Sequence, residues 1–374
     1  MKPKPVFRQR TIPPLLLRFL VKRPDRDGFT LIELLVSMLI ASFMVSGLLY
    51  LVVEILQTNQ RDASRSDTQR DLQMAMDYIV RDVREATYVY GVDASGAGKT
   101  SCLAVYGKSI ATTRGVDGKC TGLLDFLPSF LQPPAKLGDK GNYPVLAFWK
   151  PEPLPVKIRD SCKKNFAKVG DIGNDALNDT PCVSQRMYTL VVYSLSTEDA
   201  KSFNWKGKAR IKRYQLPHFT EEADLGIINK RWSSPIAKDK RPLTWPIGDK
   251  VDSKTSSVTP ATNTQLEPTD PVLDVRDLDN VVLTDFLDSE PIDYKPGHCP
   301  NGFDSPSGLN EKTFNAAFYV CVNPANLPGI NPEVNIVMRG NAAGRGGILK
   351  TGNLPFQMET RVLSRGVYSK EKSQ

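Results

Sequence analysis

The sequence predicts an α+β fold in which one long N-terminal helix packs on an antiparallel β-sheet. Three observations lead to this prediction. An uncharged apolar run fills residues 34–53, no proline interrupts the chain between Phe29 and Tyr90, and β-type runs separated by turn residues follow. The chain has 374 residues, of which 40% are apolar, so it can bury a sizeable core.

The apolar run LLVSMLIASFMVSGLLYLVV, residues 34–53, is 20 residues long and carries no charge. At about 1.5 Å per residue, a helix of this length spans the roughly 30 Å hydrocarbon core of a bilayer. A helix buried in a soluble core is the alternative, but core helices rarely remain uncharged on every face for so long. We therefore expect residues 29–56 to form one membrane-spanning half of the long helix.

Basic residues cluster ahead of this run. Residues 1–28 contain eight Lys or Arg and two Asp, a net charge of +6, which leaves +2 of the total +8 for the rest of the chain. Because basic flanks stay in the cytoplasm, the C-terminal part is expected on the periplasmic or extracytoplasmic side of the inner membrane. The nearly neutral remainder argues against a nucleic-acid partner.

The order of segments at the N-terminus differs from that of a secretory signal peptide, because the small residue Gly28 precedes the apolar run. Cleavage there would leave the helix on the mature chain. Residues 28–33, GFTLIE, resemble the type IV prepilin signal. The resemblance implies that residues 1–28 are a leader, that a prepilin peptidase cuts between Gly28 and Phe29, and that Phe29 is then N-methylated.

Glu33 places a charge at the start of the apolar helix. The helix dipole stabilises a carboxylate in the first turn by about 0.3 to 1 kcal/mol, whereas burial deep in a bilayer costs roughly 2.5 to 3.5 kcal/mol. Cleavage would create a cation, the α-amino group of Phe29, which a neighbouring subunit could bring to Glu33. The resemblance accordingly implies that Glu33 sets the register between subunits of a filament.

Residues 57–90 are expected to form the periplasmic half of the helix. Residues 57–71, QTNQRDASRSDTQRD, have no large apolar side chain and predict an exposed connection or a surface that packs in an assembly. Apolar residues then recur at helical spacing, which predicts one face packed on a sheet. These residues are Leu72, Met76, Ile79, Val83 and Ala86.

The end of this helix carries a second resemblance. Residues 76–86, MDYIVRDVREA, are similar to the corresponding segment of minor pilins and pseudopilins of the PilW and GspJ type. A solvated helix face is the expected role of the charged residues in this stretch. They are Arg81, Asp82, Arg84 and Glu85.

Residues 91–374 are expected to form a β-rich globular domain with long insertions. The Pro-, Thr- and Ser-rich stretch 233–272 predicts a loop or disorder. Strand-like runs occupy residues 102–108, 143–150, 187–196, 209–216, 281–287, 317–322, 334–339 and 356–364.

All six cysteines follow the apolar run, where an oxidising compartment favours disulfides. Sequential pairing would close three local loops, and free buried cysteine is the alternative. A zinc site is not expected, because there is no CxxC motif and only two histidines are present, His218 and His298. The six are Cys102, Cys120, Cys162, Cys182, Cys299 and Cys321.

The sequence predicts neither an enzyme nor a cofactor or metal site. The stretch DASGAGKTS, residues 93–101, lacks the first glycine of a phosphate-binding loop and runs into a strand-like segment. Four carboxylates near residue 290 lack the spacing of a calcium loop and are expected in a solvated loop. They are Asp285, Asp288, Glu290 and Asp293.

Together the resemblances imply a minor pseudopilin or minor pilin that takes part in assembling a type II secretion or type IV pilus-like filament. Its implied partners are a prepilin peptidase, other pilins or pseudopilins, and an inner-membrane assembly platform. The layout is similar to that of the HpsC type of pseudopilin, which implies polysaccharide secretion. The alternatives are a minor pilin of a motility or DNA-uptake pilus, and a membrane-tethered binding protein with a prepilin-type signal.

Overall fold

The computed structural model describes the chain in two compact units, Met1–Thr58 and Asn59–Gln374, and the helix α1, Leu31–Arg84, contributes to both. The described residues are 28–90, 127, 131, 134, 140–164, 182, 184–198, 205–217, 219, 250–251, 258–259, 279–288, 299–300, 303, 306, 317–323, 333–345 and 355–365.

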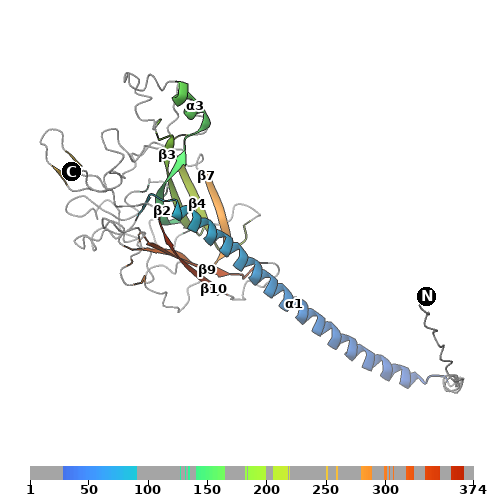
Figure 1. Ribbon diagram of the computed structural model, residues 1–374. Coiled ribbons are helices and arrows are strands. Elements are labelled where there is room, and N and C mark those ends of the chain that lie inside the picture. The colour runs from blue at the N-terminus through green and yellow to red at the C-terminus, as the bar shows by residue number, and fades with distance from the viewer. Residues whose placement is uncertain are drawn as a thin grey trace, which may run out of the picture. The chain divides into compact units, whose positions relative to one another are not determined.

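Helix α1 is continuous over 54 residues (Figure 1), as the absence of proline predicts. Glu33 lies in its first turn and Arg81 and Arg84 in its last, the arrangement that the helix dipole favours. The helix ends in a tightened turn, since the amide of Ala86 donates to the carbonyl of Val83 at 3.1 Å. The predicted uninterrupted helix is thus confirmed, but it ends six residues before the predicted bound of 90, because Tyr88 and Val89 already pair with β2 as strand β1.

The second unit contains one antiparallel sheet of eight strands in the order β1-β2-β3-β4-β7-β9-β10, with β8 also paired to β9. Helix α1 lies against this sheet with its second half (Figure 1), so the α+β prediction is confirmed. The strands are β1, Tyr88–Val89; β2, Asn142–Pro153; β3, Arg186–Ser196; β4, Ala209–Pro217; β7, Asp279–Leu287; β8, Phe318–Val322; β9, Glu333–Asn341; and β10, Pro355–Leu363.

Seven of the eight predicted strand runs correspond to β2, β3, β4, β7, β8, β9 and β10, and the run at 102–108 lies outside the described residues. A short helix, α3, Val156–Lys164, was not predicted. Inside the stretch 233–272, β5, Lys250–Val251, pairs with β6, Val258–Thr259. The prediction of a loop or disorder misses this ladder, and the rest of that stretch lies outside the described residues.

The core of the second unit forms where α1 meets the sheet. Leu72, Ile79 and Val83 are fully buried, which confirms the predicted apolar face of the helix. Each such side chain contributes about 1.5 to 3 kcal/mol by leaving water. Gly340 on β9 permits the close approach, because a Cβ there would lie 3.1 Å from Leu72 Cδ2 and 2.7 Å from the ring of Phe356.

A second, smaller core lies under α3, where Ile158 of the helix packs with Phe219. The disulfide Cys162–Cys182 belongs to this core, and a further disulfide, Cys299–Cys321, ties residue 299 to β8. These are two of the three bridges of sequential pairing. Cys102 and Cys120 lie outside the described residues.

The polar stretch 57–71 is not exposed throughout. Ser64 and Thr68 are buried, with exposed fractions of 6% and 0%. The Thr68 hydroxyl donates to the Ser64 carbonyl at 2.8 Å, and the Ser64 hydroxyl donates to the carbonyl of Arg345 at 3.4 Å. The expectation of an exposed connection is wrong at these two positions, because small hydroxyl side chains pack closely once hydrogen-bonded and leave no apolar pattern in the sequence.

Candidate functional site at the start of the long helix

Thr30 caps the N-terminus of α1. Its carbonyl accepts hydrogen bonds from the amides of Glu33 and Leu34 at 3.1 and 3.2 Å, and its hydroxyl oxygen accepts from the Glu33 amide at 3.4 Å. Thr30 is therefore a structural residue that the sequence analysis missed. The pattern Thr30-Leu31-Ile32-Glu33 has the spacing of a capping box, and this signal could have revealed it.

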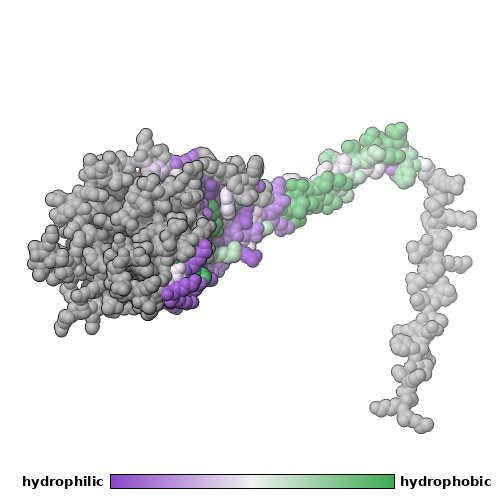
Figure 2. Space-filling view, turned by 90° about the horizontal axis from the view of Figure 1, so that it is seen from above, coloured by the Kyte–Doolittle hydropathy of each residue, from purple (hydrophilic) through white to green (hydrophobic). Residues whose placement is uncertain are grey.

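The helix that follows exposes apolar side chains on every side. All residues from 28 to 63 are exposed, and Phe29 at the predicted cleavage point is 79% exposed. Figure 2 shows the apolar stretch as a mostly green surface. By length and composition this helix can cross a membrane. Because a soluble monomer rarely exposes such a surface, the stretch needs lipid or protein around it.

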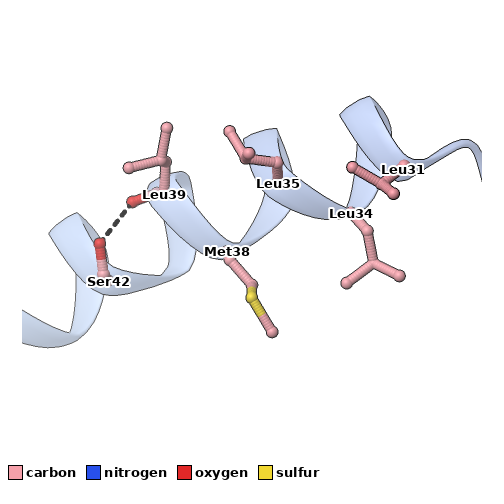
Figure 3. A pocket seen from close by; sticks show the side chains of 6 residues that line it. All are labelled: Leu31, Leu34, Leu35, Met38, Leu39 and Ser42. Carbon is pink, nitrogen blue, oxygen red and sulfur yellow. Dashed lines mark hydrogen bonds between the residues drawn. The ribbon is translucent and has the colours of Figure 1, made fainter.

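One side of the first three turns is shallowly grooved (Figure 3). The Ser42 hydroxyl donates to the Leu39 carbonyl at 2.8 Å, and the Ser37 hydroxyl donates to the Leu34 carbonyl at 2.9 Å. These hydroxyls are thus satisfied within the helix, and the groove suits apolar packing. Its lining comes from a single helix and consists of Leu31, Leu34, Leu35, Met38, Leu39 and Ser42.

Comparison with known proteins decides what this N-terminus is. Residues 23–49 match the family model of the prokaryotic N-terminal methylation motif. The chain carries a prepilin-type signal. This signal, which includes Gly28, Phe29 and Glu33, supports a type IV pilin-like protein that a prepilin peptidase processes and that its apolar helix anchors in a membrane. No curated protein and no solved structure matches the chain.

A polar cluster lies in the globular unit, around Asp82 of α1. Its Oδ1 accepts a hydrogen bond from Lys150 Nζ at 2.9 Å. Its Oδ2 accepts from the Tyr193 hydroxyl at 2.7 Å and from Arg213 Nε at 2.8 Å. The expectation of a solvated face is therefore wrong for Asp82, which is only 6% exposed, whereas Arg81, Arg84 and Glu85 are exposed as expected.

The charges around Asp82 fix its ionisation. Burial would raise the pKa of Asp82, but the charge of Arg213 and the hydrogen bonds from Tyr193, Arg213 and Lys150 hold that pKa below its usual value. Burial would likewise lower the pKa of Lys150, but Asp82 and Glu152, the latter at 3.0 Å, raise it. Both residues stay charged, so the cluster ties α1 to β2, β3 and β4.

Two of the predicted loop carboxylates are also buried among donors. Asp285 Oδ2 accepts hydrogen bonds from the amides of Lys206 and Gly207 at 2.8 and 2.7 Å. Asp288 Oδ2 lies 2.8 Å from Arg339 Nε. The expected solvated loop is thus wrong at these positions, and Glu290 and Asp293 lie outside the described residues. Within the described part of the chain, no three or more His, Cys, Asp and Glu residues form a group that could hold a metal ion.

Proposed function

We propose that this chain is a minor pseudopilin or minor pilin, cut between Gly28 and Phe29, that takes part in assembling a type II secretion or type IV pilus-like filament. The observation that supports this most directly is the methylation motif placed at the start of α1, whose next seven turns expose apolar side chains on all sides. Such a helix can move from lipid into a bundle of like helices without exposing its side chains to water.

The geometry at Glu33 supports a role in assembly. Thr30 caps the amide of Glu33, but among the described residues the Glu33 carboxylate does not accept the reciprocal capping-box bond from the Thr30 amide. The Glu33 side chain has no hydrogen-bond partner within the described residues. Cleavage after Gly28 would place a free amino group on Phe29, and the amino group of a neighbouring subunit would neutralise the carboxylate as the two helices pack.

The partners of this proposal are a prepilin peptidase, other pilins or pseudopilins, and an inner-membrane assembly platform, with the sheet domain on the extracytoplasmic side. The long leader, the large insertions and the six cysteines support a pseudopilin for polysaccharide secretion. A minor pilin of a motility or DNA-uptake pilus would use the same helix and the same Glu33.

Mass spectrometry of the mature protein tests the processing step. We expect the chain to begin at a methylated Phe29, because the motif places Gly28 at the cut. An intact leader on the membrane-inserted protein would contradict the proposal.

The assembly step is tested by comparing Glu33→Ala with Glu54→Ala, a change of the same residue type on the same helix. We expect Glu33→Ala to reduce filament assembly or secretion at least tenfold, since it removes a charge pair inside a low-dielectric bundle, and Glu54→Ala to leave it nearly unchanged. If both variants assemble normally and only deletion of residues 233–272 abolishes function, the chain is instead a membrane-tethered binding protein.

A further inference from the structure

Two arginines hold the same flank of α1 in the globular unit. Arg213 of β4 pairs with Asp82 at 2.8 Å and lies 5.7 Å from the centre of the Tyr78 ring. Arg345, in the turn after β9, pairs with Asp71 at 2.6 Å and lies 5.5 Å from the centre of the Phe286 ring. Each arginine thus joins one helical carboxylate and one aromatic ring.

The spacing of the two carboxylates suits a fixed helix register. Asp71 and Asp82 are 11 residues apart, or three turns of helix, so they point to the same side and lie about 16 Å apart along the axis. A slip of α1 by one turn would take both carboxylates away from their arginines. The two pairs therefore stabilise a single axial position of the helix on the sheet.

The two pairs differ in exposure. The side chains of Arg213 and Asp82 are 6% and 9% exposed, whereas those of Arg345 and Asp71 are 26% and 37% exposed. A buried pair is shielded from salt, while a partly exposed pair is screened by it. We call Arg345–Asp71 the outer pair and Arg213–Asp82 the inner pair. At high salt the outer pair can therefore open while the inner pair remains closed.

Phe286, whose ring Arg345 contacts, has a strained backbone conformation. Phe286 has a φ of 60°, a conformation that a bulky residue rarely adopts. The turn at Gly207 holds it there, because the amide of Gly207 donates to Asp285 and a Cβ on Gly207 would lie 2.4 Å from the Phe286 nitrogen. Strain of this kind persists only where the surrounding structure enforces it. The fold therefore holds the Phe286 ring in a fixed position against Arg345.

The helix segment under the outer pair depends on this contact. Residues 59–71 contain no large apolar side chain, and their buried members are Ser64 and Thr68. Arg345 contacts this segment at three points: its guanidinium reaches Asp71 and, at 3.4 Å, the Thr68 hydroxyl, and its carbonyl accepts from Ser64. In proteins most helical stability comes from packing of an apolar face, which this segment lacks, so its order relies on polar contacts such as those of Arg345.

We propose that Arg345 is a releasable latch on residues 59–71 of α1, and that Arg213 is the permanent clamp that keeps residues 72–84 on the sheet when the latch opens. The latch controls the order of the helix where it enters the globular unit, without unfolding the sheet. This role stands whether or not the chain enters a filament.

Hydrogen exchange of the full chain in detergent micelles, read by mass spectrometry, tests the latch. In Arg345→Gln we expect amides of residues 62–71 to exchange about tenfold faster, as for loss of one charged hydrogen bond, while residues 72–84 keep their protection. Raising salt to about 1 M, where the screening length is about 3 Å, should speed the same amides in the natural protein.

The matched control is Arg61→Gln, which removes an exposed arginine from the same helix and should change nothing. The double variant Asp71→Arg with Arg345→Asp, which restores the pair in reverse, should recover most of the protection. Unchanged exchange of residues 62–71 in Arg345→Gln would overturn the proposal. A parallel rise at residues 72–84 would also overturn it, since the helix would then leave the sheet as one piece.

Discussion

Asp82 carries its negative charge inside the contact between α1 and the sheet, with one donor from each of β2, β3 and β4. Replacing it with Asn keeps the shape but leaves Arg213 and Lys150 buried without their shared counter-charge. We expect Asp82→Asn to lower the free energy of unfolding by about 3 kcal/mol at neutral pH. Denaturant unfolding of the full chain in detergent, followed by the fluorescence of buried Trp149, measures this.

The effect of Asp82 should depend on pH. The folded state lowers the pKa of this carboxyl, so its contribution is complete above its ordinary pKa of about 4 and disappears as pH falls through the lower, folded value. The difference between the natural protein and Asp82→Asn should therefore narrow below about pH 4. Asp77→Asn, on the exposed side of the same helix, should leave the free energy of unfolding at neutral pH nearly unchanged. A difference that persists unchanged in acid would mean that the Asn substitution acts through packing.

At the residue scale, the prepilin-type signal is local and the partners of Asp82 are not. Gly28, Phe29 and Glu33 lie within six consecutive residues, and their pattern could be recognised without any structure. The partners of Asp82 lie 68, 111 and 131 residues away in the chain, and no spacing rule connects them. A buried aspartate on a helix therefore looks like a solvated one until the sheet is in place.

We expect helix α3 to depend on the disulfide Cys162–Cys182. Its nine residues are too few for a stable isolated helix, and only Ile158 and Cys162 are buried. The bridge Cys162–Cys182 closes a sequence separation of 20 residues, worth about 3 kcal/mol in loop entropy. In Cys162→Ser with Cys182→Ser we expect faster hydrogen exchange over residues 156–164, with β3 still protected.

The matched control for α3 is Cys299→Ser with Cys321→Ser, which opens the bridge to β8 and should leave exchange in α3 unchanged. If the first double variant unfolds the sheet as well, the small core under α3 is part of the main folding unit. If α3 keeps its protection without the bridge, packing of Ile158 and Phe219 is sufficient.

Strands were predictable as elements because alternation and β-branched residues are local, but their order was not. β4 pairs with β7 and β7 with β9, across long intervening segments, and no local pattern specifies that order. Helix α3 was missed because two buried positions on a charged segment give too weak a periodicity. The buried residues of the polar stretch of α1 were missed, since Ser64 and Thr68 carry no apolar signal.

At the scale of the whole molecule, the two units are stable in different environments. Residues 31–56 expose apolar side chains that lipid or neighbouring helices must cover, whereas the sheet unit contains two disulfides that an oxidising compartment sustains. The basic leader and the bridges both support the proposed orientation, with the sheet outside the cytoplasm.

The cysteines themselves can report this orientation. In a background of Cys102→Ser and Cys120→Ser, only the four bridged cysteines remain, and a polymer-linked maleimide added to denatured, unreduced protein should give no mass shift on a gel. A variant without residues 1–58 stays in the cytoplasm, where thiols are kept reduced, and should be labelled at all four. Labelling of the membrane-anchored chain to the same extent would place its sheet domain on the cytoplasmic side and contradict the proposed orientation. After treatment with reductant both proteins must give the full shift, which shows that the thiols are accessible once the bridges open.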